Sequence, residues 1–428
     1  MTDPLIVMRS LHIAATALAA GTVGFVALVA EPVLRAGAPA DVAAMRRRWR
    51  AMAWIALGVA ILTGGGWLAL LAAEIYGAPV IAVCLHGGAW SVLTGTRFGL
   101  VWTSRLGLAI TLGLLLLGPV TRPAPRAQWI AQLVAAAALI ALLAFVGHAG
   151  AAPGTIGEVH LASDIVHLIG AGTWLGSLPA LVLLFAQARG DGKAEWRRIA
   201  ARVAARYSVL GMLAVGALLA SGLINSWMLL SEPRDLIATG YGRMVALKAA
   251  LFAAMVGIAS VNRFWLTPRL AAPGALRALT RNSLGETGLG LGVIVFVGAL
   301  GTMQPTVHVH VGPPDIPATA AFTHIHTEEA MADVTIDPGR TGQVNATIRV
   351  LRPDLTQYPA KAVTLALDPP ASGQQSIARV AARLPDGSWQ VDAMELARGG
   401  TWTVRVVITS ERDTPIVLDA PIVIEQGK

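Results

Sequence analysis

The chain has 428 residues, of which 55% are hydrophobic and only 14% are charged, and its mean hydropathy is +0.62. A soluble domain usually carries about 25% charged residues, so this composition excludes an ordinary soluble protein and indicates a polytopic membrane protein. The formal net charge is +8, but the basic residues gather in particular loops, which indicates membrane orientation rather than nucleic-acid binding.

Eight apolar segments are long enough to cross a bilayer, for which a helix needs about 20 residues. They lie at roughly residues 6–34, 52–73, 98–120, 127–149, 160–187, 203–230, 241–266 and 283–303. An all-α membrane bundle of eight transmembrane helices is therefore predicted. The stretch 78–96 is apolar but interrupted by glycine, so we expect a re-entrant or interfacial piece there. The first residues lack a basic leader and a small-residue cleavage site, so we expect no cleavable signal peptide.

Basic residues alternate between the loops. The richer loops hold five, two, six and four Lys or Arg, at residues 35–50, 121–128, 189–206 and 263–281. The opposite loops are poorer, because 149–159 holds none and 231–243 holds two. The positive-inside rule places the richer loops in the cytoplasm. We therefore expect a multi-pass membrane protein with both termini outside the cytoplasm, in the periplasm or its equivalent.

Weak internal repeats connect the two halves of the membrane part. The sequence RSLHIAATALAAG (9–21) resembles DIVHLIGAGTWLG (164–176), and TRFGLVWTSR (96–105) resembles TGYGRMVALK (239–248). The tripeptide FVG also recurs near the end of each half. The matches keep the same order and nearly the same offset, so we predict two parallel four-helix repeats. Such a plan is common among proteins that move a solute across a bilayer.

The composition changes after the eighth span. Runs of alternating apolar residues such as QVNATIRV and TWTVRVVI are separated by turn formers such as DPGRTG and LPDGS. This pattern predicts an extracytoplasmic β-sandwich of about seven strands, joined to the membrane part by a linker. The expected domains are a first membrane repeat, a second membrane repeat, a His-rich linker and the β-sandwich, at residues 1–150, 151–304, 305–330 and 331–428.

Histidines provide the main functional signal, because none of the nine lies in a basic loop. On the fifth span His160, Asp164 and His167 are spaced i, i+4, i+7 and share one helical face, with His167 about 10 Å deeper than His160. His148 closes the preceding span and can reach the same place. Ionisable groups in a bilayer usually face a partner, and imidazole is a good ligand for copper, zinc and nickel. We predict a metal pathway here; the alternative is that these groups only join helices by hydrogen bonds.

Further metal ligands are predicted outside this cluster. His12 is the repeat-mate of His167 and is expected to approach the bundle axis, with a packing histidine as the alternative. The linker contains two His-x-His motifs, whose rings point to one side of an extended segment and are typical of metal-collecting tracts. The predicted capture residues near the membrane mouth are His308, His310, His324, His326 and Met303.

Six other residues of the membrane part are assigned structural roles. Glu31 is expected to snorkel toward the inner boundary, with an inner-gate carboxylate as the alternative. Trp90, Trp102, Trp174 and Trp227 are expected to anchor the helices at the outer boundary. Glu286 is expected to form an ion pair with one of three basic residues, Arg281, Arg263 or Lys248.

The membrane part resembles the CopD copper-resistance family. The resemblance is carried by DIVHLIGAGTWLGSLPAL, ARYSVLGMLAVGALLASGLINSW and GYGRMVALKAALFAAMVGIASVNRFWLTPRL, followed by Glu286, and it is strongest over about 140–305. It implies copper handling at the inner membrane and identifies His148, His160 and His167 with the family's outward-facing histidines. The tail IDPGRTGQVNATIRV looks like periplasmic β domains fused to some members.

These observations predict a copper transporter without enzymatic activity, which takes copper ions from the periplasm into the cytoplasm. A periplasmic copper chaperone is a candidate partner in addition to the lipid bilayer, and no nucleic-acid partner is expected. No Gly-rich phosphate loop with Gly-Lys-Ser/Thr is present, so direct ATP drive is not expected. Two alternatives remain open: a membrane electron carrier with His12 and His167 as axial ligands of a b-type haem, and a copper sensor or assembly protein whose β domain docks a periplasmic partner.

Overall fold

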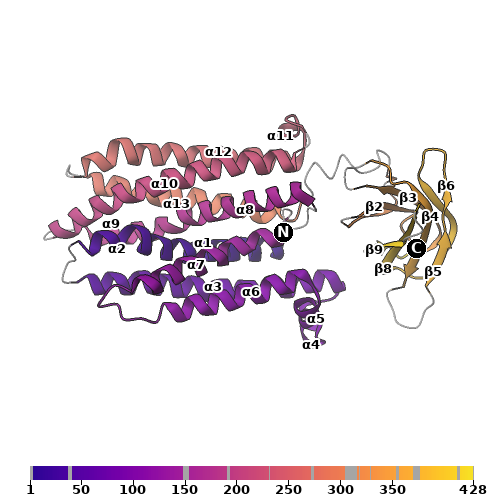
Figure 1. Cartoon of the computed structure of the whole chain (residues 1–428), viewed down its shortest axis with the longest axis horizontal. Helices are drawn as coiled ribbons and strands as arrows, with labels where there is room; N and C mark the ends of the chain where they lie inside the picture. The colour runs from indigo at the N-terminus through magenta and orange to yellow at the C-terminus, as the bar shows by residue number, and fades with distance from the viewer. Residues whose placement is uncertain are drawn as a thin grey trace. The chain divides into compact units, whose positions relative to one another are not determined.

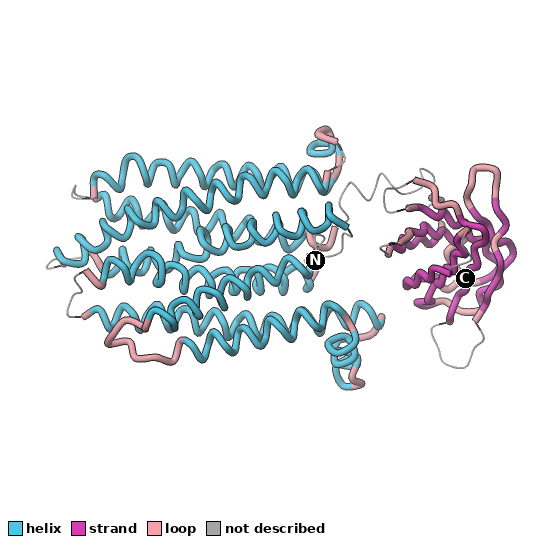
Figure 2. Tube along the Cα trace, viewed as in Figure 1, coloured by secondary structure: helices cyan, strands magenta, loops and turns pink. Residues whose placement is uncertain are grey.

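The computed structural model describes residues 3–36, 41–147, 154–189, 193–230, 232–270, 274–303, 316–317, 319–327, 329–352, 356–369, 376–411 and 415–427. A helical unit lies within residues 1–306 and a unit of strands within residues 307–428 (Figures 1 and 2). Each unit has its own core and is described separately below.

The described part of the helical unit contains eight helices that are long and apolar enough to cross a membrane, which confirms the predicted all-α bundle. Several of them are built from consecutive α-, π- and 3-10-helical segments. The eight are α1 (Pro4–Phe25) continued by η1 (Val26–Ala30) and α2 (Glu31–Leu34); α3 (Val42–Tyr76); α6 (Arg97–Leu115); α7 (Arg126–Ala141) continued by η2 (Leu142–Val146); α8 (Gly154–Trp174) continued by η4 (Leu175–Ser177) and α9 (Leu178–Gln187); α10 (Ala194–Leu229); α12 (Gly240–Val261) continued by η5 (Asn262–Leu266) and η6 (Thr267–Arg269); and α13 (Ala275–Leu300).

Two helices begin earlier than the hydropathy pattern predicts. α3 starts at Val42 rather than near 52, and α10 starts at Ala194 rather than near 203. Most of the basic residues expected in these two loops therefore lie on helix. Arginine is a good helix former, and a helix can continue past the hydrocarbon core without interruption. The stretch 78–96 forms two short helices, α4 (Val80–Leu85) and α5 (Gly88–Gly95), and α11 (Asp235–Ala238) is the short helix before α12.

The turns that start α6 and α12 have the same local structure. The hydroxyl of Thr96 accepts a hydrogen bond from the N–H of Gly99 at 3.0 Å, and the hydroxyl of Thr239 accepts one from the N–H of Gly242 at 2.9 Å. A β-carbon added at either glycine would lie about 2 Å from a backbone oxygen of the preceding segment, so only glycine fits. These matched caps support the two parallel repeats.

The first helices of the two repeats meet at equivalent glycines. A β-carbon on Gly21 would lie 2.2 Å from the carbonyl carbon of Gly176, and one on Gly176 would lie 1.9 Å from the oxygen of Ala17. The hydroxyl of Ser177 donates a hydrogen bond to the oxygen of Gly21 at 3.0 Å. Small residues allow helix backbones to approach this closely within a membrane. The two halves of the bundle are thus joined backbone to backbone.

Of the four tryptophans predicted as boundary anchors, Trp90 and Trp227 are exposed, but Trp102 and Trp174 lie in the bundle interior. Trp102 is 8% exposed and Trp174 only 2%, so their predicted role as boundary anchors is wrong. The indole N–H of Trp102 donates to the oxygen of Gly64 at 2.9 Å. Burial of a tryptophan is favourable when its N–H has such an acceptor. The acceptor cannot be recognised from the number of tryptophans in the sequence.

The strand unit contains nine strands within its described residues, two more than predicted, and they form two antiparallel sheets. The first sheet has the order β1-β2-β3-β7-β6 and the second β5-β4-β8-β9. The strands are β1 (Ala321–His326), β2 (Met331–Asp337), β3 (Gly342–Leu351), β4 (Ala360–Asp368), β5 (Ile377–Val380), β6 (Ala382–Arg383), β7 (Trp389–Leu396), β8 (Gly400–Ser410) and β9 (Pro415–Ile424). Alternating residues of both sheets form one apolar core, as in a β-sandwich.

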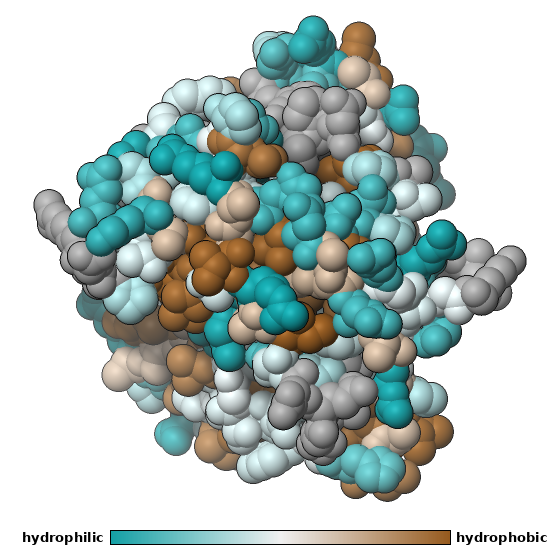
Figure 3. Space-filling model, turned by 90° about the vertical axis from the view of Figure 1, so that its right-hand side faces the viewer, coloured by the Kyte–Doolittle hydropathy of each residue, from teal (hydrophilic) through white to brown (hydrophobic). Residues whose placement is uncertain are grey.

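Strand β1 lies within the range that the sequence suggests is a linker. It pairs with β2 in a register that sets His324 opposite Asp333. Some apolar residues of this unit remain exposed on the surface, including Val380, Val417 and Val423. Figure 3 shows hydrophilic and hydrophobic residues interspersed on the face that it views.

Candidate functional site

The histidine of the first repeat is enclosed by hydrogen bonds. His12 projects from α1 into the bundle and is 5% exposed. Its Nε2 lies 2.7 Å from a guanidinium nitrogen of Arg105, and its Nδ1 lies 2.9 Å from the oxygen of Ala60. Because arginine can only donate, Nε2 is the acceptor and Nδ1 carries the proton that Ala60 accepts. Both ring nitrogens of His12 are therefore occupied.

Arg105 is the polar centre of the first repeat. It is 4% exposed, and it also donates to the hydroxyl of Thr16 at 3.2 Å and to the oxygen of Leu139. The ring of Trp102 lies 5.0 Å from that of His12, centroid to centroid, and the guanidinium carbon of Arg105 lies 5.4 Å from the Trp102 ring. A buried cation needs several such partners to offset the loss of water. This arrangement is a packed polar core.

The equivalent histidine of the second repeat has different surroundings. His167 projects from α8, and its Nδ1 lies 3.0 Å from the hydroxyl of Ser221 on α10. That hydroxyl donates to the oxygen of Ala217 at 2.6 Å, so it can accept from His167. The ring of His167 also interacts with the backbone of Leu218, and no hydrogen bond to its Nε2 is found within the described part of the chain. One imidazole nitrogen is therefore available to a ligand.

A carboxylate and an ammonium accompany His167. One oxygen of Asp164 accepts a hydrogen bond from the side-chain amide of Asn225 at 3.2 Å, and the amide oxygen of Asn225 is buried without a partner. Lys248, the repeat-mate of Arg105, interacts electrostatically with both Asp164 and His167. An unpartnered buried oxygen is costly, so this group is a candidate contact for a bound ion or water.

The residue before the predicted third histidine lies beside this cluster. His148 lies outside the described residues, but Gly147 is described, and a β-carbon there would lie 3.9 Å from the second oxygen of Asp164. His160, one further turn along the same helix face, is buried and makes interactions of its own. Of the three predicted histidines the structure thus describes His160 and His167, both on α8, and the three-histidine cluster stays a prediction.

The structure describes only some of the other predicted ligands. His308 and His310 lie outside the described residues, and His326 is in β1 with a side chain that is not described. His324 contacts Asp333 at 2.5 Å, Nδ1 to Oδ1, in a partly buried pair. The methyl group of Met303 lies 3.6 Å from where a β-carbon would stand on Gly240. No three His, Cys, Asp or Glu side chains of the described ranges come together as a metal site.

A second polar group occupies the middle of α13 in the second repeat. Glu286 of α13 is 2% exposed, and its Oε1 accepts a hydrogen bond from Asn262 at 2.6 Å. Asn262 in turn accepts from the amide of Asn282 at 2.8 Å. Asn262 begins the π-helical segment η5, a type of wide turn that is frequent at functional sites. Glu286 and Asn262 border a cavity of about 400 Å³ between α8–α9, α10, α12–η5 and α13.

The expected ion pair of Glu286 is wrong. Arg263 donates instead to the hydroxyl of Ser208 at 2.6 Å, and no salt bridge to Glu286 is found among the residues that the structure describes. The hydrogen bond between Asn262 and Glu286 was not predicted, because an uncharged amide 24 residues away leaves no charge pattern in the sequence. A buried carboxylate within a membrane bundle is by default a candidate functional group.

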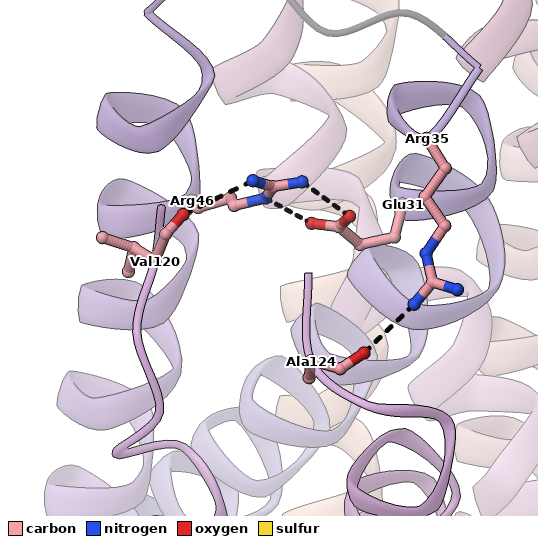
Figure 4. Close-up of polar contacts among 5 residues, drawn as sticks. All are labelled: Glu31, Arg35, Arg46, Val120 and Ala124. Carbon is pink, nitrogen blue, oxygen red and sulfur yellow. Dashed lines mark hydrogen bonds and ion pairs between the residues drawn. The ribbon is translucent and has the colours of Figure 1, made fainter. Parts of the chain in front are cut away.

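Glu31 does not snorkel. It is 3% exposed, and both of its oxygens accept hydrogen bonds from Arg46, at 2.6 and 2.9 Å (Figure 4). Arg46 also donates to the oxygen of Val120 at 3.4 Å, and Arg35 donates to that of Ala124 at 3.1 Å. The helix α3 extends far enough to supply Arg46, which the predicted start near 52 had placed in a loop. This pair joins α2 and α3 to the α6–α7 connection.

Two family models match the chain. The model for the copper resistance protein D-like N-terminal domain matches residues 1–158, and the model for copper resistance protein D matches residues 201–300. Together they cover parts of both repeats of the helical unit.

Three curated proteins are similar to this chain. Inner membrane protein YebZ of Escherichia coli (strain K12) is 33% identical over 223 residues, which are 50% of this chain and 72% of that protein. Copper resistance protein D of Pseudomonas syringae pv. tomato is 27% identical over 50% of this chain and 71% of its own length. Copper transport protein CutJ of Bacillus subtilis (strain 168) is 28% identical over 68% of this chain, which spans about half of CutJ. This chain is a membrane protein that belongs to the copper resistance protein D family.

Proposed function

We propose that this protein carries copper ions across the bacterial inner membrane, from the periplasm to the cytoplasm, and that the second repeat provides the route. The single observation that supports this proposal is the free Nε2 of His167 beside Asp164. Imidazole nitrogen is a good copper ligand, and a carboxylate within the membrane lowers the electrostatic cost of a cation there.

The orientation follows from the distribution of charge. Arg46 and Arg50 lie near the start of α3, and Arg197, Arg198 and Arg202 lie near the start of α10, at the end of the bundle that the positive-inside rule assigns to the cytoplasm. His160 and His167 enter from the opposite end of α8. Copper would therefore first meet His160 and then, about 10 Å deeper, His167.

The inner end of the proposed route is the cavity beside Glu286. Carboxylate and amide oxygens are harder ligands than imidazole, so they hold Cu(I) less tightly. An ion that passes from His167 to Glu286 and Asn262 would therefore be bound progressively more weakly. Conduction requires binding that is strong enough for entry and weak enough for release.

Capture at the periplasmic face is assigned to the linker histidines. His308, His310 and His326 would collect copper, and His324, whose Nδ1 is held by Asp333, would be oriented by that carboxylate. A carboxylate on one ring nitrogen is the usual way in which a metal-binding imidazole is positioned. A periplasmic copper chaperone would deliver the ion to this segment.

The hydrogen bonds of His12 favour transport over the haem alternative. A b-type haem held by His12 and His167 would need one nitrogen of each ring for iron. Both nitrogens of His12 are already engaged, one of them by a guanidinium that would have to be displaced.

Substitution of His167 tests the route. We expect His167→Ala to lower copper accumulation in cells by at least about tenfold, toward the level without the protein. The matched control is His86→Ala, because His86 is exposed and contacts only its own turn at the oxygen of Ala82. Membrane levels of both variants should be equalised by immunoblot. Uptake by His167→Ala equal to that of the control would exclude the route, and a Soret absorption band without bound copper would favour the haem carrier.

A further inference from the structure

A second cavity lies at the Arg-rich end of the first repeat. It has a volume of about 190 Å³ and is bordered by α1–η1, α3, the end of α6, the start of α7 and the connection between the last two. At about 30 Å³ for each water, this space holds about six waters, which is room for a phosphate group but not for a whole lipid.

The charge in this cavity is unbalanced. Its charged lining residues are Glu31, Arg46, Arg50 and Arg122. The carboxylate of Glu31 is neutralised by the two-point contact with Arg46 (Figure 4). Neither Arg50 nor Arg122 has an acidic partner among the residues described by the structure. Two positive charges therefore remain without compensation.

Hydrogen-bond donors also remain. Arg50 uses one nitrogen on the oxygen of Gly118, and Arg46 uses three contacts on Glu31 and Val120. A guanidinium has five N–H groups, so each of these arginines keeps donors that can face the cavity. Arginine recognises phosphate oxygens through pairs of such donors. The carbonyl contacts meanwhile hold the side chains in place.

The surroundings of the cavity are those of a membrane boundary. Trp129 lies at its rim, with the guanidinium carbon of Arg35 4.9 Å from its ring. Leu114 and Leu117, at the end of α6, are more than 60% exposed and offer a surface for acyl chains beside the polar pocket. Tryptophan and arginine at a helix end commonly lie at the level of the lipid headgroups, and basic pockets between helices bind anionic headgroups.

From these observations we propose that the Arg46–Arg50–Arg122 cavity binds a phosphate-bearing anion, namely the phosphodiester of an anionic phospholipid such as phosphatidylglycerol. Free phosphate shares the same chemistry and is the other source to be tested. The bound anion would fasten α3 to the α6–α7 connection at the same boundary at which the Glu31–Arg46 pair acts.

The test is lipid binding by the purified full chain in a neutral detergent, measured by native mass spectrometry and by the rise in Tm. The variant Arg50→Gln/Arg122→Gln should bind phosphatidylglycerol about tenfold more weakly than the unchanged protein and lose the rise in Tm. The control Arg47→Gln/Arg126→Gln removes the same charge from the same two regions outside the cavity, and it should bind normally. Phosphatidylcholine should give no rise in Tm for any form.

The outcomes separate the alternatives. Arg122→Gln alone provides a second variant that keeps the fold, because Arg122 makes no hydrogen bond within the described part of the chain. Inorganic phosphate that raises the Tm as much as the lipid, through the same arginines, would assign the cavity to free phosphate. If the cavity variant and its control lose binding equally, general surface charge explains the binding and the proposal is overturned. Unchanged binding in both variants would also overturn it.

Discussion

The two repeats of the bundle place a histidine and a basic residue at equivalent positions but use them differently. In the first repeat Arg105 donates directly to His12, and the ring is closed on both sides. In the second repeat Lys248 takes the place of Arg105, and Asp164 shares its charge. Among the described residues, no hydrogen bond to Nε2 of His167 is found. The same scaffold thus carries one packed polar core and one open polar cluster.

This difference shows that duplication alone does not predict two working sites. Arg105 and Lys248 are both cations, but arginine offers a rigid fork of donors whereas lysine offers a single point charge. The fork reaches His12, Thr16 and Leu139 together. The ammonium of Lys248 interacts with the carboxylate of Asp164, so it does not require His167 as a hydrogen-bond acceptor. Three predictions test the comparison, beginning with the contact that both repeats share.

The largest effect is expected from Gly21→Ala. The new methyl group would lie 2.2 Å from the backbone of Gly176, and a backbone cannot move aside as a side chain can. We expect the free energy of unfolding in detergent to fall by more than about 3 kcal/mol, which is beyond the usual cost of overpacking. Denaturant unfolding and size-exclusion profiles would measure the loss.

Gly24→Ala is the matched control for that substitution. It lies three residues along the same helix, and a β-carbon there would meet nothing within 4 Å. Its stability should equal or slightly exceed that of the unchanged protein, because alanine is the better helix former. Equal stability of the Gly21 and Gly24 variants would show that the repeats are not fixed at this crossing.

A smaller effect is expected when the same substitution is made in each repeat. His12→Ala leaves the guanidinium of Arg105 without one of its acceptors and opens a void, so we expect a loss of about 3 kcal/mol in unfolding free energy. His167→Ala removes contacts with Ser221 and with the backbone of Leu218 but leaves no buried guanidinium without an acceptor, so it should cost less, about 1 kcal/mol. The amount of copper bound per folded molecule should show the opposite order, with the larger loss in His167→Ala and the smaller loss in His12→Ala. Similar stability losses in both variants would remove the distinction between a closed and an open repeat.

The smallest effect is expected at Asn225. The amide of Asn225 positions Asp164, so Asn225→Ala should weaken copper binding about tenfold while the fold is kept. Isothermal titration with Cu(I) held in a competing chelator would measure the change. Ser226→Ala is a suitable control, because Ser226 bonds only to its own helix at Gly222. An unchanged affinity in Asn225→Ala would show that Asp164 does not help to hold the ion.

The fold was largely predictable because lipid imposes simple rules. Length and hydropathy located the eight spans, and alternating apolar residues indicated the sandwich. The starts of α3 and α10 were misplaced because hydropathy reports contact with lipid rather than the continuity of a helix. Strand β1 escaped prediction because six residues that include two histidines look like a solvated tract.

The site was predictable only where its residues are close in sequence. The i, i+4, i+7 spacing identified the shared face of His160, Asp164 and His167. The partners of His12 and Glu286 lie 93 and 24 residues away, and their choice depends on packing and on the π-helical turn at Asn262. Polar residues inside apolar spans, such as Arg105 and Asn225, were the available signal. Such residues can be noticed in a sequence before their partners are known.

The crossing at Gly21 and Gly176 has a mechanical consequence. Two backbones in direct contact cannot slide along each other without collision, but they can rotate about the point at which they touch. If the repeats move during a transport cycle, we expect that crossing to act as a pivot, with the largest displacements at the two ends of the bundle.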